Sequence, residues 1–471
     1  MTTDRPDTAS RVRDALHLEA PWEIYGQRLR RFELYFDGTH VETVRGPITL
    51  EGVGIRVFRP RGSSLGVGLH ATSDLSPEGL RAAHRFAEAN AKAGTFPASQ
   101  FELPSKAPKV ARGPEVCSAP LWESPAEAVE AFVHALLAPL EGVSDVRASF
   151  GSVRATLSET SIANSEGLDT SYVATEAELE LALAAFGGPE GPPPGEYWVN
   201  REMRTLETGP VSSWVTAWAQ RARDVRRARP PVSGTMPVAF PPSQLSEILP
   251  QAMALRFSGT GRLQRMALAT GTAIAPSAIT IQRDPTLPWA PGSAPVDDEG
   301  ALPSPVALVD HGATGELAYD VLHAAAFDRR TNGAAGRLEV FGPHAWYRFV
   351  HRPVPLVTPM TVACGPDGTE EELLEGIEEG LWVDQLGWAN PDPRAGTFGG
   401  ELRVGYRIHH GKLAEPVRGG TVGGPVYSTD GSPSLLGGVM RIGSRAELVG
   451  RLLAPSLVVK GPVVAGGSPP A

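Results

Sequence analysis

The chain has 471 residues, of which 41% are hydrophobic and 20% are charged, a composition typical of a folded globular protein of about two or three domains. Its 53 acidic residues outnumber its 43 lysine and arginine residues, which gives a formal net charge of −10. Non-specific binding to nucleic acid requires a basic face, so this balance argues against a nucleic-acid-binding role.

The first part of the chain predicts several strands followed by a helix. Apolar and charged positions alternate in places over Trp22–Phe36, and we expect a strand there. Further strands are predicted over Glu42–Thr49 and Val53–Phe58. The segment Ser76–Glu78 offers an N-cap serine, a proline at the first helical position and an acidic first turn. It predicts a helix that continues to about Ala93.

A second helix is predicted to begin at Ser124, where Ser-Pro-Ala-Glu has the pattern of a capping box, and to stop at Pro139. Strands are expected over Asp145–Ser158. They are followed by an Asn-Ser-Glu-Gly segment that contains Asn164 and Ser165. Asparagine and glycine tolerate a positive φ angle, so this segment predicts a tight turn.

The segment Ala177–Leu183 allows two interpretations. Its alanine, leucine and glutamate residues are good helix formers, but apolar and glutamate positions alternate with a period of two. We therefore favour a pair of strands around the loop Gly187–Glu196. A helix with one apolar side and a basic end is predicted over Ser213–Ala228, and the basic end complements the helix dipole. The segment Pro230–Gly234 then predicts a boundary between domains of residues 1–230 and 231–471.

The second half opens with a predicted strand over Thr235–Phe240 and a helix over about Ser243–Phe257. This helix contains no histidine, and we expect Pro250 to kink it. A stretch that starts at Thr280 predicts a long surface loop held by Asx turns. A second interpretation of the same stretch is a carboxylate cluster for Ca²⁺ or Mg²⁺, which prefer oxygen ligands. The carboxylates concerned are those of Asp284, Asp297, Asp298 and Glu299.

Helices are predicted further on over Glu316–Phe327 and, with acidic residues at its start, over Glu370–Leu381. Short strands follow, bounded by glycine-rich turns. These strands are predicted over Thr397–Phe398, Leu402–Ile408 and Lys412–Val417. The neighbours His409 and His410 fall at a strand end, where side chains of successive residues point to opposite faces. The sequence therefore does not predict that these two imidazoles share a metal ion.

The two cysteines, Cys117 and Cys364, predict two reduced thiols in a cytosolic protein. No apolar run reaches the roughly 20 residues needed to cross a bilayer. The opening residues MTTDRPDTAS lack the pattern of a leader peptide. We therefore expect a cytoplasmic location and no membrane partner.

The order of these segments resembles that of the TldD/PmbA family, and the resemblance covers about Trp22 to Gly466. It implies an α+β fold, with an N-terminal mixed α/β domain and a C-terminal domain that is mostly antiparallel and barrel-like. An older label of this family is modulator of DNA gyrase. The net negative charge of the chain gives no support to a DNA-binding role. The segments similar to family motifs are Gly52–Phe58, Thr72–Glu78, Ile162–Leu168, Thr280–Gly300 and Gly396–Phe398.

In TldD-type members, the helix equivalent to Ser243–Phe257 carries HExxxH, and a later element supplies a cysteine ligand to zinc. Two histidines on one helix can hold a metal ion while the glutamate acts as general base. Here Glu247 and Ala252 align near the two ligand positions, and the counterpart of the cysteine element, Tyr427–Ser432, has no cysteine. The resemblance therefore implies a PmbA/TldE-type chain with no catalytic residue and no metal ligand, whose zinc is held by a TldD-type partner.

Three functions are open at this point. The first is a non-catalytic subunit of a heterodimeric metalloprotease complex that acts in proteolysis or peptide processing on unfolded or modified peptides. The second is a stand-alone homodimer or larger homo-oligomer that binds peptides or small ligands without catalysis. The third is a hydrolase with a metal in the acidic loop. The candidates for lining a loop or cavity are Asn164, Ser165, Asp284, Asp297, Asp298 and Glu299.

Overall fold

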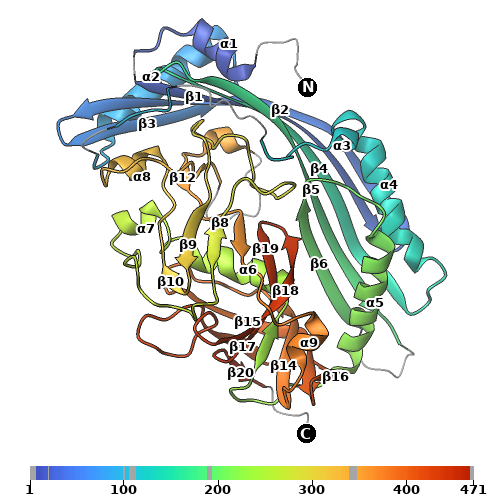
Figure 1. Ribbon diagram of the computed structural model, residues 1–471. Coiled ribbons are helices and arrows are strands. Elements are labelled where there is room, and N and C mark those ends of the chain that lie inside the picture. The colour runs from blue at the N-terminus through green and yellow to red at the C-terminus, as the bar shows by residue number, and fades with distance from the viewer. Residues whose placement is uncertain are drawn as a thin grey trace.

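The computed structural model describes residues 7–19, 21–98, 101–105, 113–187, 194–338 and 347–466. Two large sheets dominate these ranges, one of six strands and one of 12 strands. Figure 1 shows that the long strands of the six-stranded sheet curve around the rest of the chain as a half-barrel. Helices cover the outer side of this half-barrel. The mixture of helices and largely antiparallel strands confirms the expected α+β fold.

The six-stranded sheet is antiparallel throughout and has the strand order β3-β2-β1-β4-β5-β6. Its strands are β1 (Trp22–Asp37), β2 (His40–Arg61), β3 (Ser64–Thr72), β4 (Val146–Asn164), β5 (Asp169–Ala185) and β6 (Gly195–Met203).

Within the described part of the first half, five helices accompany this sheet. They are α1 (Thr8–Ala15), α2 (Pro77–Ala93), α3 (Ala119–Glu123), α4 (Pro125–Leu137) and α5 (Val211–Arg227), with a 3₁₀ turn, η1 (Ala138–Leu140), after α4. The side chains of Leu179, Leu181 and Leu183 on β5 are buried in one cluster with residues of α4 and α5. The alternation in this segment therefore belongs to a strand, as predicted. The loop between β5 and β6 is described only at its ends, because residues 188–193 lie outside the described ranges.

The start of α2 agrees with its sequence, but the start of α4 does not. The Ser76 hydroxyl accepts a hydrogen bond from Gly79 N at 3.1 Å, so the predicted N-cap is present. The side chain of Ser124 makes no cap hydrogen bond, and the predicted capping box is wrong. Ser124 also ends α3, where its N–H donates to Pro120 O and its ψ is 64° rather than extended. This conformation differs from the extended one that an N-cap needs.

The close approach of α2 to β3 requires glycine. A Cβ atom at Gly68 would lie only 1.9 Å from the carbonyl oxygen of Ala87, which is a backbone atom and cannot move aside. The absence of a side chain lets the helix rest directly on the strand. This contact fixes α2 over the outer face of the half-barrel.

The 12-stranded sheet has the order β10-β9-β8-β13-β19-β7-β14-β15-β17-β20, with β16 on β15 and β18 on β19. Two of its pairings are parallel, β13 with β19 and β14 with β7, and the others are antiparallel. A separate pair consists of β11 (Ala335–Gly336) and β12 (Val354–Pro355). The strands of the large sheet are β7 (Val238–Phe240), β8 (Ile281–Arg283), β9 (Val306–Asp310), β10 (Ala313–Thr314), β13 (Met360–Val362), β14 (Glu379–Gly387), β15 (Thr397–His409), β16 (Lys412–Val417), β17 (Thr421–Pro425), β18 (Val439–Val449), β19 (Leu452–Val459) and β20 (Val463–Ala465).

Two predicted helices of the second half are much shorter than expected. The described helices here are α6 (Pro242–Met253), α7 (Gly259–Leu263), α8 (Val321–Ala325), α9 (Glu370–Leu374) and the 3₁₀ turn η2 (Arg348–Val350). The acidic helix stops at Leu374 because Gly376 has a φ of 73°, and Leu381 belongs to β14 instead. The other helix begins only after Asp320, which caps it. The residues before Asp320 bind to β9, since Gly315 N and Glu316 N donate to carbonyls of that strand.

Candidate functional site

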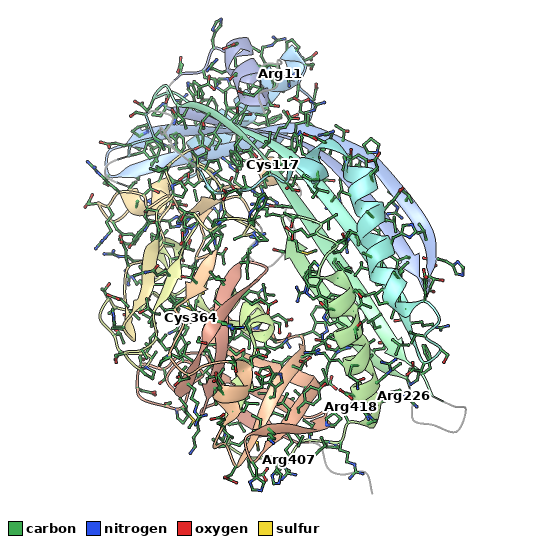
Figure 2. All side chains as sticks on the ribbon, turned by 45° about the vertical axis from the view of Figure 1, so that its right-hand side comes forward. Arg11, Cys117, Arg226, Cys364, Arg407 and Arg418 are labelled. Atoms are coloured by element: carbon green, nitrogen blue, oxygen red, sulfur yellow. The ribbon has the colours of Figure 1, made fainter. Side chains whose placement is uncertain are left out.

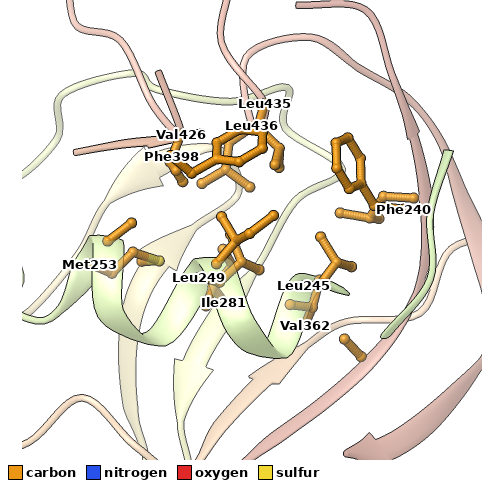
Figure 3. Close-up of a cluster of buried hydrophobic side chains, with 14 of the residues drawn as sticks. Phe240, Leu245, Leu249, Met253, Ile281, Val362, Phe398, Val426, Leu435 and Leu436 are labelled. Carbon is orange, nitrogen blue, oxygen red and sulfur yellow. The ribbon is translucent and has the colours of Figure 1, made fainter. Parts of the chain in front are cut away.

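Helix α6, the counterpart of the zinc-binding helix in the resembled family, is fixed by one apolar face. Leu245, Leu249 and Met253 are fully buried in the main core of the second sheet. Figure 3 shows them against side chains from β7, β15 and the segment after β17. Those facing side chains include Phe240, Phe398, Val426, Leu435 and Leu436. The sequence places leucine, isoleucine and methionine at helical spacing, so this face alone accounts for the position of α6.

The opposite face of α6 offers one carboxylate and no imidazole. Glu247 is exposed, whereas Ala252 is fully buried, so the two positions aligned with zinc ligands do not share a face. Tyr427 covers this end of α6 and donates its hydroxyl to Ala252 O at 3.2 Å. Desolvation by the surrounding protein raises the pKa of the Glu247 carboxyl group, although the residue as a whole is exposed to solvent. A single protonatable carboxylate does not make a zinc site, which uses about four ligands or three and a water.

The counterpart of the cysteine element is a turn closed by its own side chains. Asp430 Oδ1 accepts hydrogen bonds from Ser428 Oγ at 2.6 Å and from Ser432 N at 2.9 Å. These bonds hold the pKa of Asp430 well below its usual range. No thiol or imidazole stands in Tyr427–Ser432. The residues of α6 and of this turn therefore do not fit a zinc ion.

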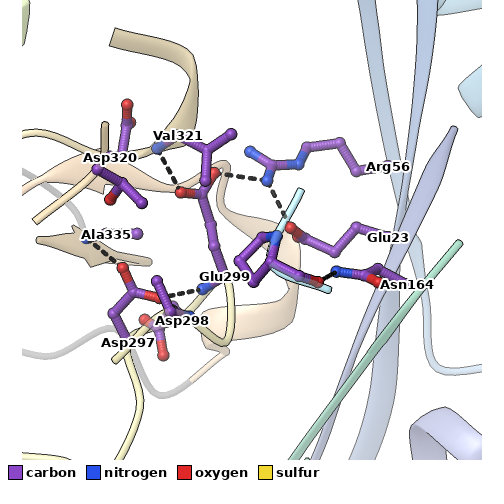
Figure 4. Close-up of polar contacts among 12 residues, drawn as sticks. Glu23, Arg56, Asn164, Asp297, Asp298, Glu299, Asp320, Val321 and Ala335 are labelled. Carbon is purple, nitrogen blue, oxygen red and sulfur yellow. Dashed lines mark hydrogen bonds and ion pairs between the residues drawn. The ribbon is translucent and has the colours of Figure 1, made fainter. Parts of the chain in front are cut away.

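The acidic loop forms a buried charge cluster, and the prediction of a surface loop is wrong for Asp297–Glu299. The side chain of Glu299 is fully buried. Figure 4 shows that its carboxylate lies between Arg56 of β2 and the start of α8. Glu299 Oε1 accepts from Arg56 Nη2 at 2.6 Å, and Oε2 accepts from Val321 N at 2.7 Å. Arg56 Nη2 also donates to Glu23 of β1 at 2.5 Å.

A second buried arginine completes this cluster. Arg337 Nη2 donates to Glu23 Oε1 at 2.5 Å, and its backbone N–H donates to Asp298 Oδ2 at 2.6 Å. Two guanidinium groups thus hold the half-barrel against the second half of the chain. These contacts join β1 and β2 of the half-barrel to the loop before β9 and to Arg337, the residue that follows β11. The cluster therefore positions the two halves relative to each other.

The carboxylate of Asp297 accepts hydrogen bonds from three backbone N–H groups. Its Oδ1 accepts from Glu299 N at 3.0 Å and Ala301 N at 2.8 Å, and its Oδ2 accepts from Ala335 N at 3.1 Å. These donors satisfy the carboxylate in the way of an Asx turn. The neighbouring arginines supply the positive charge that a metal ion would otherwise bring. Over the described ranges, no group of three or more histidine, cysteine, aspartate or glutamate residues is placed to hold a metal ion.

The other three candidate residues form no hydrogen bond that is recorded with this cluster. Asp284 accepts from Thr286 N at 3.0 Å and Thr286 Oγ1 at 2.6 Å, which is an Asx turn. Asn164 accepts from two backbone N–H groups of its own turn and donates to Pro104 O at 2.8 Å. Ser165 Oγ accepts from Trp22 N at 3.3 Å. These contacts account for the local structure around the three residues. Their proposed role in lining a cavity stays a prediction.

Sequence reasoning missed the partners of the acidic loop, namely Glu23, Arg56 and Arg337. A signal was present, because Glu23 and Arg56 each interrupt an otherwise apolar stretch of a strand. A charged residue in a buried strand needs a partner of opposite charge. The sequence alone does not say which residue that partner is.

Comparisons with known proteins relate this chain to a family of metallopeptidases. Residues 233–466 match the PmbA/TldA metallopeptidase C-terminal domain family. The chain is 25% identical over 193 residues to a "Metalloprotease TldD homolog" of Haemophilus influenzae, which covers 40% of this chain and 38% of that protein. It is 27% identical over 192 residues to a "Metalloprotease" of Archaeoglobus fulgidus, covering 40% of this chain and 42% of that protein. The matched stretch thus spans about two-fifths of the length of these curated relatives.

Among solved structures, TldE from Thermococcus kodakarensis has the same fold, with a TM-score of 0.76 and 18% identity. That likeness covers 97% of this chain and 99% of the other. The chain belongs to the TldD/PmbA family. The resemblance first seen in short motifs is therefore confirmed for the family. Within the described residues, no helix of this family member combines the length and apolar composition that crossing a bilayer would need.

The buried cluster gives this family member an expected dependence of stability on pH. Burial raises the pKa of Glu299 to about 8, and burial raises that of Asp297 to about 7. The same contacts raise the pKa of Arg56, so the guanidinium stays charged. Arg56 can stay ionised while Glu299 takes up a proton. The reason is that the cluster contains more carboxyl groups than the two guanidinium groups of Arg56 and Arg337 can neutralise. Those carboxyl groups belong to Glu23, Asp297, Asp298, Glu299 and Asp320.

In the unfolded chain, Glu and Asp have pKa values of about 4.3 and about 3.9. The folded chain therefore binds more protons between about pH 4 and about pH 8, and its free energy of unfolding falls as pH rises through this window. Urea unfolding at about pH 5.5 and about pH 8.5 measures this fall. We expect a smaller fall in Glu299→Gln, since the amide does not titrate. An equal fall in the variant and the unchanged protein would contradict the assignment to Glu299.

Proposed function

We propose that this chain is a non-catalytic TldE/PmbA-type subunit that pairs with a TldD-type metalloprotease subunit. The observation that carries the proposal is the outward face of α6. Glu247 is the one carboxylate that this face presents, while Ala252 is turned into the core. The turn Tyr427–Ser432 offers no thiol. Catalysis by zinc in such a complex would therefore depend on ligands that the partner supplies.

The proposed substrate is an unfolded or modified peptide, processed by the partner's active site. The contribution of this chain would be to enclose that site and help hold the peptide. The extended backbone of an unfolded peptide suits recognition by strand addition to a sheet edge. We place the complex in the cytoplasm, in line with the sequence-based expectation.

We also propose that residues 1–230 and 231–471 are the two domains of this subunit. The division is supported by the buried clusters on either side of it. One large cluster is built from residues between Val238 and Val464. A second joins residues between Leu34 and Val225, and among the described residues Val404 is its one fully buried member from the second half. Each part thus has an apolar core of its own, which is the physical requirement for a domain.

Co-expression with a TldD-type chain that carries HExxxH tests the pairing. We expect a complex whose mass exceeds the 49.9 kDa of this chain by that of one partner. Zinc content and peptidase activity are expected in the complex, and activity is expected to vanish when the partner's HExxxH glutamate becomes glutamine. If the purified chain forms a homodimer and does not bind the TldD-type chain, the proposed pairing is contradicted. A chain that binds zinc stoichiometrically at α6 and cleaves peptides alone would contradict the non-catalytic role.

The same complex tests whether α6 of this chain takes part in the chemistry. We expect Glu247→Gln in this chain to leave kcat/KM for peptide cleavage within about twofold, since a residue outside the reacting centre does not stabilise the transition state. The matched control is the glutamate-to-glutamine change in the partner's HExxxH. A tenfold or larger loss of kcat/KM in Glu247→Gln would show that this carboxylate contributes to catalysis and would contradict the non-catalytic role.

A further inference from the structure

The turn between β15 and β16 brings two imidazoles together, contrary to the sequence prediction. His409 pairs with Lys412 across the hairpin, which leaves His410 and Gly411 as a two-residue loop. Both loop residues have positive φ angles, 49° and 74°, as in a type I′ turn. The left-handed backbone rotates the side chain of His410 away from the alternation of a strand. The ring centroids of His409 and His410 consequently lie 4.0 Å apart.

Each of the two rings is oriented by its own carboxylate. His409 Nδ1 lies 2.7 Å from Glu379 Oε1, and His410 Nδ1 lies 2.5 Å from Glu378 Oε2. Glu379 also accepts hydrogen bonds from Arg407 Nε at 2.8 Å and from Arg407 Nη2 at 2.5 Å. A carboxylate acceptor places the ring proton on Nδ1. In the neutral rings, the lone pairs are therefore on the Nε2 atoms.

The two Nε2 atoms are available to a ligand from solvent. Neither has a hydrogen-bond partner within the part of the chain that the structure describes. The side chain of His409 is 41% exposed and that of His410 is 69% exposed. An imidazole that gives Nδ1–H to a carboxylate and leaves Nε2 free has the arrangement seen in metal-binding histidines. Two such units stand side by side here.

The charge around the turn is compatible with a cation. Arg407 lies close to His409, with Nη2 3.2 Å from Nδ1. Its guanidinium is already paired with Glu379 and, at 3.0 Å, with Glu415. Lys412 is the other basic residue of the hairpin turn. Three carboxylates, those of Glu378, Glu379 and Glu415, thus face two basic side chains and leave the turn with net negative charge. Figure 2 places Arg407 at the far end of the molecule from Arg11.

We propose that His409 and His410 form a binding site for a divalent transition-metal ion. The Nε2 atoms are its two protein ligands, water completes the coordination, and Glu378 and Glu379 orient the rings. Imidazole nitrogens suit zinc, copper and nickel rather than Mg²⁺ or Ca²⁺. The site does not use α6 or the turn Tyr427–Ser432, which carry the proposed function, so the two proposals are tested separately.

Zinc binding to the full chain, purified without a histidine tag, tests the proposal. Isothermal titration with Zn²⁺ at about pH 7.5 is expected to show one site per chain. His409→Ala and His410→Ala each remove one of two ligands, and we expect the Kd to rise at least tenfold in either variant. The paired change Glu378→Gln and Glu379→Gln keeps both ligands but weakens their orientation. We expect a rise in Kd of about 10–100-fold there.

His311 provides a matched control. It is also an exposed histidine whose Nδ1 lies 2.7 Å from a carboxylate, that of Asp310. Among the described residues, no second imidazole is recorded in ring contact with it. His311→Ala is expected to leave Zn²⁺ binding unchanged. Equal Zn²⁺ binding by the unchanged chain and by the double variant His409→Ala/His410→Ala would overturn the site. Unchanged binding after the paired glutamate substitution would overturn the role given to Glu378 and Glu379.

Discussion

Replacing Arg56 by methionine is expected to lower the free energy of unfolding by about 3–5 kcal/mol. The guanidinium is 1% exposed and donates to two carboxylates, Glu23 and Glu299, that are fully buried. Methionine fills a similar volume but leaves both carboxylates without this partner. An uncompensated buried charge is far more costly than the loss of an exposed ion pair. Urea unfolding followed by tryptophan fluorescence measures the change.

The matched control for Arg56 is Arg59, three residues along the same strand. Its guanidinium is 25% exposed and pairs with Glu88 of α2. We expect Arg59→Met to cost less than about 1 kcal/mol, the usual range for a partly exposed pair. Adding Glu299→Gln to Arg56→Met should restore part of the lost stability, since it removes one of the two buried carboxyl groups that lose their partner. An equal loss of unfolding free energy in Arg56→Met and Arg59→Met would contradict the larger contribution assigned to the buried cluster.

Local patterns in the sequence predicted much of the fold. The alternation in β5 and the N-cap of α2 depend on neighbours within a few residues, and both predictions are confirmed. The helices expected over Glu316–Phe327 and Glu370–Leu381 also had helical spacing. They are cut short because their residues pair with β9 or enter β14. Tertiary strand pairing overrode a local preference at both places.

The buried cluster could not be predicted from local patterns. Arg56 and Glu299 are 243 residues apart in sequence, and Arg337 and Glu23 are 314 apart. The acidic residues of the loop could be recognised, but their arginine partners depend on how the half-barrel docks against the second half. The turn at His410 shows the same limit on a smaller scale. One left-handed residue there reverses the side-chain direction that strand alternation predicts.

Replacing Leu249 of α6 by alanine is expected to lower the free energy of unfolding by about 2–5 kcal/mol. The side chain is fully buried in the main core, where Figure 3 shows it among residues from several strands. Truncation removes buried methyl groups and leaves a cavity that the surrounding sheet cannot fully close. The control is Gln251→Ala, two residues further on and exposed to solvent. Its expected effect is within about 0.5 kcal/mol.

The Leu249→Ala variant also separates a structural helix from a catalytic one. If α6 of this chain only supports the fold, the variant complex with a TldD-type chain should lose thermal stability but keep its peptidase activity per folded complex. If α6 instead aligned a reacting group, a shift of about 1 Å would lower kcat by about 100-fold even in the folded fraction. Activity measured well below the melting transition, and normalised to folded complex, distinguishes the two cases. The expected result is unchanged activity, because the face of α6 that packs in the core holds no group that reacts.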